Sequence, residues 1–113
     1  MRSRIALLAC ALATPALGQS SYFMNGNVLY QRCISRDVQD AVYCLGFVAA
    51  SLDMINLHVD ALNGIPPYCA PEKVTVKQAT DVVTAYLATN PKDRHQVAAA
   101  LVTLAVREAW PCR

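Results

Sequence analysis

The sequence predicts an all-α fold: a small four-helix domain, of four to five helices in all, closed by two disulfides. Apolar residues recur at helical spacing inside segments that open on capping residues. Strand signals are weak, because the only run of β-forming residues, 73–76, overlaps a helix cap. An even set of cysteines behind an export signal indicates disulfides formed in an oxidising compartment. These cysteines are Cys33, Cys44, Cys69 and Cys112.

Residues 1–18 are expected to be a cleaved signal peptide, which leaves residues 19–113 as one helical domain. Two arginines precede a short apolar core, and Ala16 and Gly18 are the small residues that a signal peptidase requires. We therefore expect cleavage near Gly18 and a periplasmic protein. One alternative is a membrane anchor, but the apolar core is about half of the roughly 20 residues that a span needs. The other is lipidation at Cys10.

The first two helices are predicted from their caps. Asn25 is placed to cap a first helix that runs to about Cys33. Asp37 is placed to cap a second helix, with Asp40 three residues later in a variant of the capping box. The second helix should end at Asn63-Gly64. Its predicted inner face consists of Ala41, Cys44, Leu45, Val48, Leu52, Ile55 and Val59.

The third helix opens on the capping box Thr75-Val76-Lys77-Gln78. Its predicted inner face consists of Val76, Ala79, Val82, Val83, Tyr86 and Leu87. Asn90 is expected to cap the fourth helix, with Pro91 at its first position and Asp93 at its third. This helix is apolar almost all round from Val97 to Val106, and it is too short to span a membrane. It should therefore be buried on several sides or form one side of a dimer interface.

Four cysteines allow three pairings, and the order of the helices favours one of them. Cys33 ends the first helix, a short loop away from the second helix, which carries Cys44. Cys69 precedes the third helix and Cys112 follows the fourth, and these helices should be antiparallel neighbours. The pairs Cys33–Cys44 and Cys69–Cys112 therefore require little distortion. Pairing Cys33 with Cys112 and Cys44 with Cys69 is the alternative.

The composition excludes several classes of function. The net charge of +2 comes from the two arginines of the predicted signal peptide, so residues 19–113 balance eight basic against eight acidic side chains. A neutral domain without a basic cluster is a poor nucleic-acid binder. His58 and His95 have no partner histidine three or four residues away, so we expect no metal site and no cofactor. We also expect no membrane span. No phosphate loop or catalytic triad is present, so we predict that the protein is not an enzyme.

Asp53 follows a strip of small residues that includes Gly46. An ion pair with Arg32 or Arg107 is one interpretation of this carboxylate, and an unpaired surface position is another. Asp53 and Asp60 share a helix face at about 10 Å. That distance suits a glycosidase pair, but no aromatic cleft residues lie near them.

An ordered set of spaced residues covers nearly the whole domain, from Phe23 to Cys112. It consists of Cys44-Leu45-Gly46-Phe47-Val48 with Asp53 beyond it, Pro67-Tyr68-Cys69-Ala70-Pro71, Gln78, Val82-Val83, Tyr86-Leu87, Asn90-Pro91 with His95 beyond, and Ala105 to Trp110-Pro111-Cys112. No single piece is specific. As a set they resemble the Rap/Tai family of periplasmic immunity proteins of type VI secretion.

The resemblance implies a small helical domain, often a homodimer, with the family's disulfide cysteines at the four positions named above. Its partner would be a protein effector, a toxin that neighbouring bacteria inject into the periplasm, typically a peptidoglycan-cleaving amidase. Gly46 and Asp53 match family positions that we interpret as structural, Gly46 for close helix packing and Asp53 for an internal polar contact. The toxin-binding surface does not carry over, because immunity surfaces differ with the toxin.

We expect the protein to bind and block such an effector. The alternative is a small periplasmic helical chaperone or stress-response binding protein, although a pH-driven chaperone needs more titrating groups than this chain has. A small hydrolase is the third alternative. Residues 63–68 and 90–95 are candidate contact segments, and ordinary polar connections are the plain alternative. Their key members are Pro66, Pro67, Lys92, Asp93, Arg94 and His95.

Overall fold

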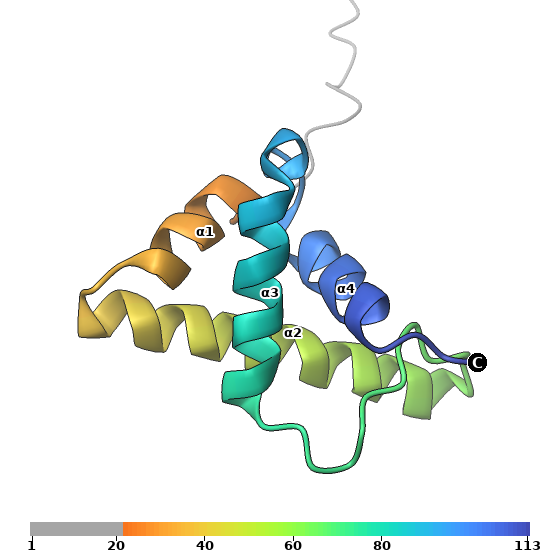
Figure 1. Cartoon of the computed structure of the whole chain (residues 1–113). Coiled ribbons are helices and arrows are strands. Elements are labelled where there is room, and N and C mark those ends of the chain that lie inside the picture. The colour runs from red at the N-terminus through yellow and green to blue at the C-terminus, as the bar shows by residue number, and fades with distance from the viewer. Residues whose placement is uncertain (1–21) are drawn as a thin grey trace, which may run out of the picture.

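A computed structural model describes residues 22–113, so the predicted signal peptide and its cleavage near Gly18 lie outside the described residues. Within 22–113 the chain forms four α-helices, one short 3-10 helix and no β-strand. The elements are α1 (Gly26–Ile34), α2 (Val38–Leu62), α3 (Val76–Thr89), η1 (Pro91–Asp93) and α4 (Ala98–Ala109). Figure 1 shows the long α2 along one side of the molecule, crossed by α3, with α1 and α4 to either side of α3. The predicted all-α, four-helix fold is confirmed.

The predicted caps of α1 and α2 form. The Asn25 side chain accepts a hydrogen bond from the Val28 N–H at 3.0 Å, and the Asp37 carboxylate accepts from Gln39 N–H at 2.8 Å. The predicted capping-box variant at α2 is wrong in one half. The Asp40 carboxylate binds the Arg32 guanidinium instead of reaching back to the Asp37 N–H, which donates to Ser35 Oγ.

The capping box of α3 is confirmed in both halves. Gln78 N–H donates to Thr75 Oγ1 at 3.1 Å, and Thr75 N–H donates to Gln78 Oε1 at 2.8 Å. At its other end α2 stops at Asn63, whose backbone takes the left-handed conformation with φ 48°. A short polar side chain tolerates this conformation better than a bulky one.

The predicted start of the fourth helix is wrong. Asn90 and Pro91 open only η1, and α4 begins at Ala98. The reason is a contact with a distant segment: Asn27 N–H donates to Arg94 O at 2.7 Å, and Gly26 N–H donates to Gln96 O at 2.9 Å. These carbonyls bind the start of α1, so they are not used to continue a helix from Pro91 into α4.

The core is built around α4, which contacts each of the other three helices. Its buried residues are Ala98, Leu101, Val102, Ala105 and Val106. They meet Leu29 from α1, Cys44 and Val48 from α2, and Ala79, Val83 and Leu87 from α3. The expectation that the fourth helix is buried on several sides agrees with these contacts.

Most of α2 lies outside this core. Cys44 and Val48 are its buried residues, whereas Ala41 and Leu45, which were predicted to face inward, are exposed. A core built on a 12-residue α4 cannot cover a helix of 25 residues. By length and composition alone α2 would also pass as a membrane span. A single helix that meets this criterion is weak evidence for a span.

Both favoured disulfides are present. Cys33 and Cys44 join α1 to α2 with a Cα–Cα distance of 5.1 Å. Cys69 and Cys112 join the segment before α3 to the segment that follows α4, with a Cα–Cα distance of 4.9 Å. The link from α3 to α4 is longer than predicted because it contains η1, but the two helices still pack against each other.

Candidate functional site

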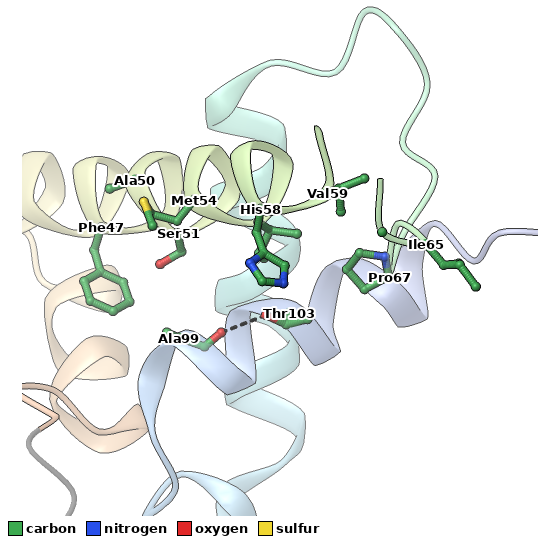
Figure 2. Close-up of a pocket in the computed structure, with 12 residues that line it drawn as sticks. Phe47, Ala50, Ser51, Met54, His58, Val59, Ile65, Pro67, Ala99 and Thr103 are labelled. Carbon is green, nitrogen blue, oxygen red and sulfur yellow. Dashed lines mark hydrogen bonds between the residues drawn. The ribbon is translucent and has the colours of Figure 1, made fainter. Parts of the chain in front are cut away.

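Within residues 22–113 an apolar groove of about 830 Å³ lies between α2, the segment that follows it, and α4. We call it the α2 groove. Its lining residues are Phe47, Ala50, Ser51, Met54, Ile55, His58, Val59, Gly64, Ile65, Pro67, Ala99 and Thr103. Figure 2 shows the residues of α2 along one wall, Ala99 and Thr103 of α4 opposite, and Ile65 and Pro67 at the end.

The sequence builds the groove in two steps. Phe47, Met54 and His58 recur on α2 at intervals of seven and four residues, which places them on one helix face. The left-handed residue Asn63 then reverses the chain, so that Ile65 returns to the last turn of α2. Pro67 is half-buried there, which fixes the end wall.

The chemistry of the α2 groove suits docking rather than reaction. His58 is the one titratable residue among its lining residues, and no carboxylate faces it. The Thr103 hydroxyl is already engaged, because it donates to Ala99 O at 3.0 Å. Among residues 22–113 no group of three His, Cys, Asp or Glu side chains is arranged to hold a metal ion. The groove therefore presents an apolar surface with no pair of groups for proton transfer.

The apolar surface continues toward the start of the described chain. Phe47 and Ala99 also line a smaller hollow with Tyr22, Phe23 and Tyr43. Phe23 is fully exposed. Contiguous exposed apolar surface of this kind marks a contact site for another molecule.

The structure separates the two predicted contact segments (Figure 1). Residues 63–68 form the end of the α2 groove, where Pro67 lines the wall and Pro66 O lies 3.7 Å from Cys112 Sγ. Residues 90–95 form η1 and the turn after it, near the start of α1. Lys92 and His95 are exposed there, and Lys92 O lies 3.0 Å from His95 Nδ1.

Arg94 differs from its neighbours, because it packs against the rest of the chain. Its guanidinium lies over the Tyr30 ring at 4.2 Å from the centroid, and its Nε is buried. Its carbonyl accepts the hydrogen bond from Asn27 described above. Asp93 is also half-buried and receives Gln96 N–H on its carbonyl. Lys92 and His95 are therefore the better-exposed members of this segment.

The structural roles expected for Gly46 and Asp53 stay predictions, because neither contact is seen within residues 22–113. A Cβ added to Gly46 meets no atom within 4 Å, so no helix of the described chain packs closely on it. Asp53 is exposed and forms no ion pair within residues 22–113, where Arg32 pairs with Asp40 instead. Asp53 lines a smaller hollow of about 260 Å³ with Tyr68 and Trp110.

The sequence reasoning missed the α2 groove although one signal for it was present. The stripe at Phe47, Met54 and His58 lies beside the predicted inner face and is itself partly apolar. A helix with apolar residues on more than one face contacts more than one surface.

Comparison with known proteins gives one match. The model of a family described as Rap1a immunity proteins matches residues 25–112, which is nearly the whole of the described chain. No curated protein and no solved structure matches the sequence.

Proposed function

We propose, from the premise that this chain belongs to the Rap1a immunity protein family, that it binds and blocks an effector of a type VI secretion system. The effector we expect is a peptidoglycan-cleaving amidase. Inhibition occurs by stoichiometric binding, without catalysis by the chain itself. The observation that carries this proposal is the family match over residues 25–112, which includes all four helices and both disulfides.

The location follows from the target. Peptidoglycan lies in the periplasm, so an inhibitor of its cleavage acts there. Residues 1–18 supply the export signal, and cleavage near Gly18 releases residues 19–113 as the immunity domain. Edman sequencing or intact mass of the periplasmic protein tests this, and a soluble product that retains residues 1–18 would contradict it.

We assign the α2 and α4 walls of the α2 groove to a second copy of the chain, whereas its end wall, which belongs to residues 63–68, is kept for the effector. Apart from His58, the α2 groove has no ionisable lining residue, so burying it against another apolar face leaves no carboxylate, lysine or arginine without a partner. Gly46 does not line the groove, and it shares a face of α2 with Asp53, seven residues later. The close packing expected at Gly46 is therefore not part of this interface.

Effector contact is assigned to the two exposed segments, residues 63–68 and 90–95. The first is stiffened by Pro66 and Pro67 and tied to the end of α4, so it loses little conformational entropy on docking. The second presents Lys92 and His95 to solvent. Both project from a helical scaffold, as binding segments commonly do.

Co-expression tests the proposal. A candidate hydrolase encoded next to this gene is directed to the periplasm with and without this protein, and cell survival is counted. We expect survival only when both are present, together with a complex on gel filtration. Equal killing in both cultures and no complex would reject the proposal for that hydrolase.

A matched pair of variants tests the assigned surface. Lys92→Glu should weaken protection, whereas Arg36→Glu, an exposed charge reversal at the α1–α2 turn, should not. Arg94→Glu is unsuitable, because it removes the contact with Tyr30. If Lys92→Glu protects as well as the wild-type protein, the contact lies elsewhere, and the face around Asp53 and Asp60 is the next candidate.

The apolar groove also supports the alternative of a periplasmic chaperone. A chaperone would suppress aggregation of several unrelated unfolded proteins, whereas an immunity protein saturates at a fixed ratio with one folded enzyme. An aggregation assay with two unrelated client proteins therefore separates the two functions.

A further inference from the structure

The two disulfides differ in how far solvent reaches them. Cys44 is 1% exposed in the core, and Cys33 is half-buried on α1. Cys69 and Cys112 are both exposed, and neither lies in a helix. Thiol–disulfide exchange requires a thiolate to reach one of the two sulfurs, so access decides which bond is reduced first.

The exposed disulfide lies in a segment whose packing is uneven, because Tyr68 and Val74 pack against the core whereas residues 63–66 are exposed. Residues 63–75 connect α2 to α3 without regular secondary structure. Among the described residues, two hydrogen bonds tie the middle of this segment to other elements. Tyr68 Oη donates to Asn56 Oδ1 at 3.1 Å, and Cys69 N–H donates to Trp110 O at 2.8 Å.

The same segment forms the end wall of the α2 groove. Ile65 and Pro67 line that wall, two to four residues before Cys69. Ile65 is 93% exposed, so its own packing does little to hold it in place. The covalent bond from Cys69 to Cys112 therefore fixes the wall to the end of α4.

We propose that the Cys69–Cys112 disulfide is a redox-sensitive latch on the α2 groove, which a dithiol reductant opens while the helical core and Cys33–Cys44 stay intact. One thiolate of the dithiol attacks a sulfur of the pair and forms a mixed disulfide, releasing the other cysteine as a thiolate. The second thiol of the dithiol then displaces the remaining cysteine. The dithiol becomes a cyclic disulfide, and the protein gains two electrons and two protons.

The consequence rests on the proposed function. With the latch open, Ile65 and Pro67 no longer hold one geometry, and residues 63–68 lose the stiffness that favours docking. Inhibition of the effector then requires the oxidised pair. The chain becomes competent to bind only after export to an oxidising compartment, and reduction reverses that competence.

Alkylation under native conditions tests the latch without any partner. The oxidised protein is treated with graded dithiothreitol at about pH 8, where the reagent is partly thiolate, quenched with iodoacetamide and mapped by mass spectrometry. We expect Cys69 and Cys112 to be alkylated at least about tenfold faster than Cys33 and Cys44, with the helical circular dichroism retained. Equal rates at all four cysteines, or loss of helicity in the same step, would overturn the latch.

Proteolysis reports the movement of the segment. Lys73 is the one trypsin site within residues 63–75, and Lys77 in α3 is an internal control. Reduction, or the double variant Cys69→Ser/Cys112→Ser, should speed cleavage after Lys73 severalfold and leave cleavage after Lys77 slow. Unchanged cleavage after Lys73 would show that the disulfide does not hold the segment.

A final arm uses an effector that the oxidised protein inhibits. The Cys69→Ser/Cys112→Ser variant should need at least about tenfold more protein for the same inhibition, which corresponds to a loss of about 1.4 kcal/mol in binding. Equal inhibition by the variant would overturn the regulatory role. If the oxidised protein inhibits no effector, the proposed function fails, and the alkylation and proteolysis arms still decide the latch.

Discussion

Gly26→Ala is expected to destabilise the fold, because Gly26 lies where α1 meets the turn before α4. A Cβ at this position would lie 2.8 Å from Arg94 O and would collide with a methyl group of Leu101. The Leu101 side chain is fully buried, so it has little room to move away. The Arg94 backbone is fixed by the hydrogen bond that its carbonyl accepts from Asn27.

The size of the effect follows from two opposing terms. Overpacking of a rigid site costs about 1–3 kcal/mol. Replacing glycine with alanine restricts the unfolded chain and returns about 0.4–1 kcal/mol. Because backbone and a fully buried side chain both obstruct the added Cβ, the overpacking cost lies in the upper part of its range, about 2–3 kcal/mol. The net loss is therefore about 1–2.6 kcal/mol, which lowers the melting temperature of a domain of this size by roughly 5–20 °C.

Two other glycines provide matched controls in the same assay. Gly46 is a mid-helix position with open space around an added Cβ, so Gly46→Ala should stabilise the monomer by about 0.5–1 kcal/mol. At Gly64 an added Cβ would lie 3.7 Å from Val59 Cα, an ordinary contact, so Gly64→Ala should change stability by less than about 0.5 kcal/mol. All three are measured by thermal and urea unfolding followed by circular dichroism.

The reasoning fails if Gly26→Ala melts within about 2 °C of the wild-type protein, a shift that corresponds to less than about 0.5 kcal/mol. It also fails if Gly46→Ala destabilises by as much as Gly26→Ala. Either result would mean that the approach of Arg94 and Leu101 to Gly26 does not exist in solution.

Three further predictions concern the core, the dependence of folding stability on acid pH, and the α2 groove. Leu87→Ala removes a fully buried side chain and should cost about 2.7–5 kcal/mol in urea unfolding. The Arg32 guanidinium holds the pKa of Asp40 below its ordinary value, so their pairing stabilises the fold above about pH 4 and is lost as the pH falls through the lowered pKa. Asp40→Asn should therefore reduce the loss of folding stability between about pH 4 and the lowered pKa. An unchanged dependence of stability on pH in this range would contradict the pairing. Met54→Glu in the α2 groove (63% exposed) should weaken self-association by about tenfold or more, measured by sedimentation velocity, with little loss of monomer stability. Leu57→Glu on the same helix (59% exposed, outside the groove) should leave self-association unchanged.

Local signals in the sequence predicted most of the fold. The caps at Asn25, Asp37 and Thr75 are hydrogen bonds that span two or three residues, so they depend little on the rest of the chain. The disulfide pairing followed from the order of the helices. Asp40 shows the limit of such local rules, because Arg32, eight residues earlier, takes its carboxylate.

What the sequence did not reveal depends on contacts between distant segments. Asn90-Pro91 is a typical helix-start signal, yet the carbonyls of Arg94 and Gln96 accept hydrogen bonds from the start of α1, so no helix continues from Pro91 into α4. Periodicity marks two apolar stripes on α2, and only the size of the packed core decides which one is covered. The groove itself needs the chain reversal at Asn63, which brings Ile65 beside α2.

The central claim is stoichiometric inhibition by binding, and a titration tests it most directly. A fixed concentration of the purified effector, well above the dissociation constant, is mixed with increasing amounts of the purified oxidised mature protein, and release of cleaved muropeptides is followed. The account predicts that activity falls linearly and reaches zero at a fixed ratio of protomers to effector, with both proteins recovered intact from the complex. Undiminished activity at excess protein, or complete loss at a small fraction of one equivalent, would contradict it.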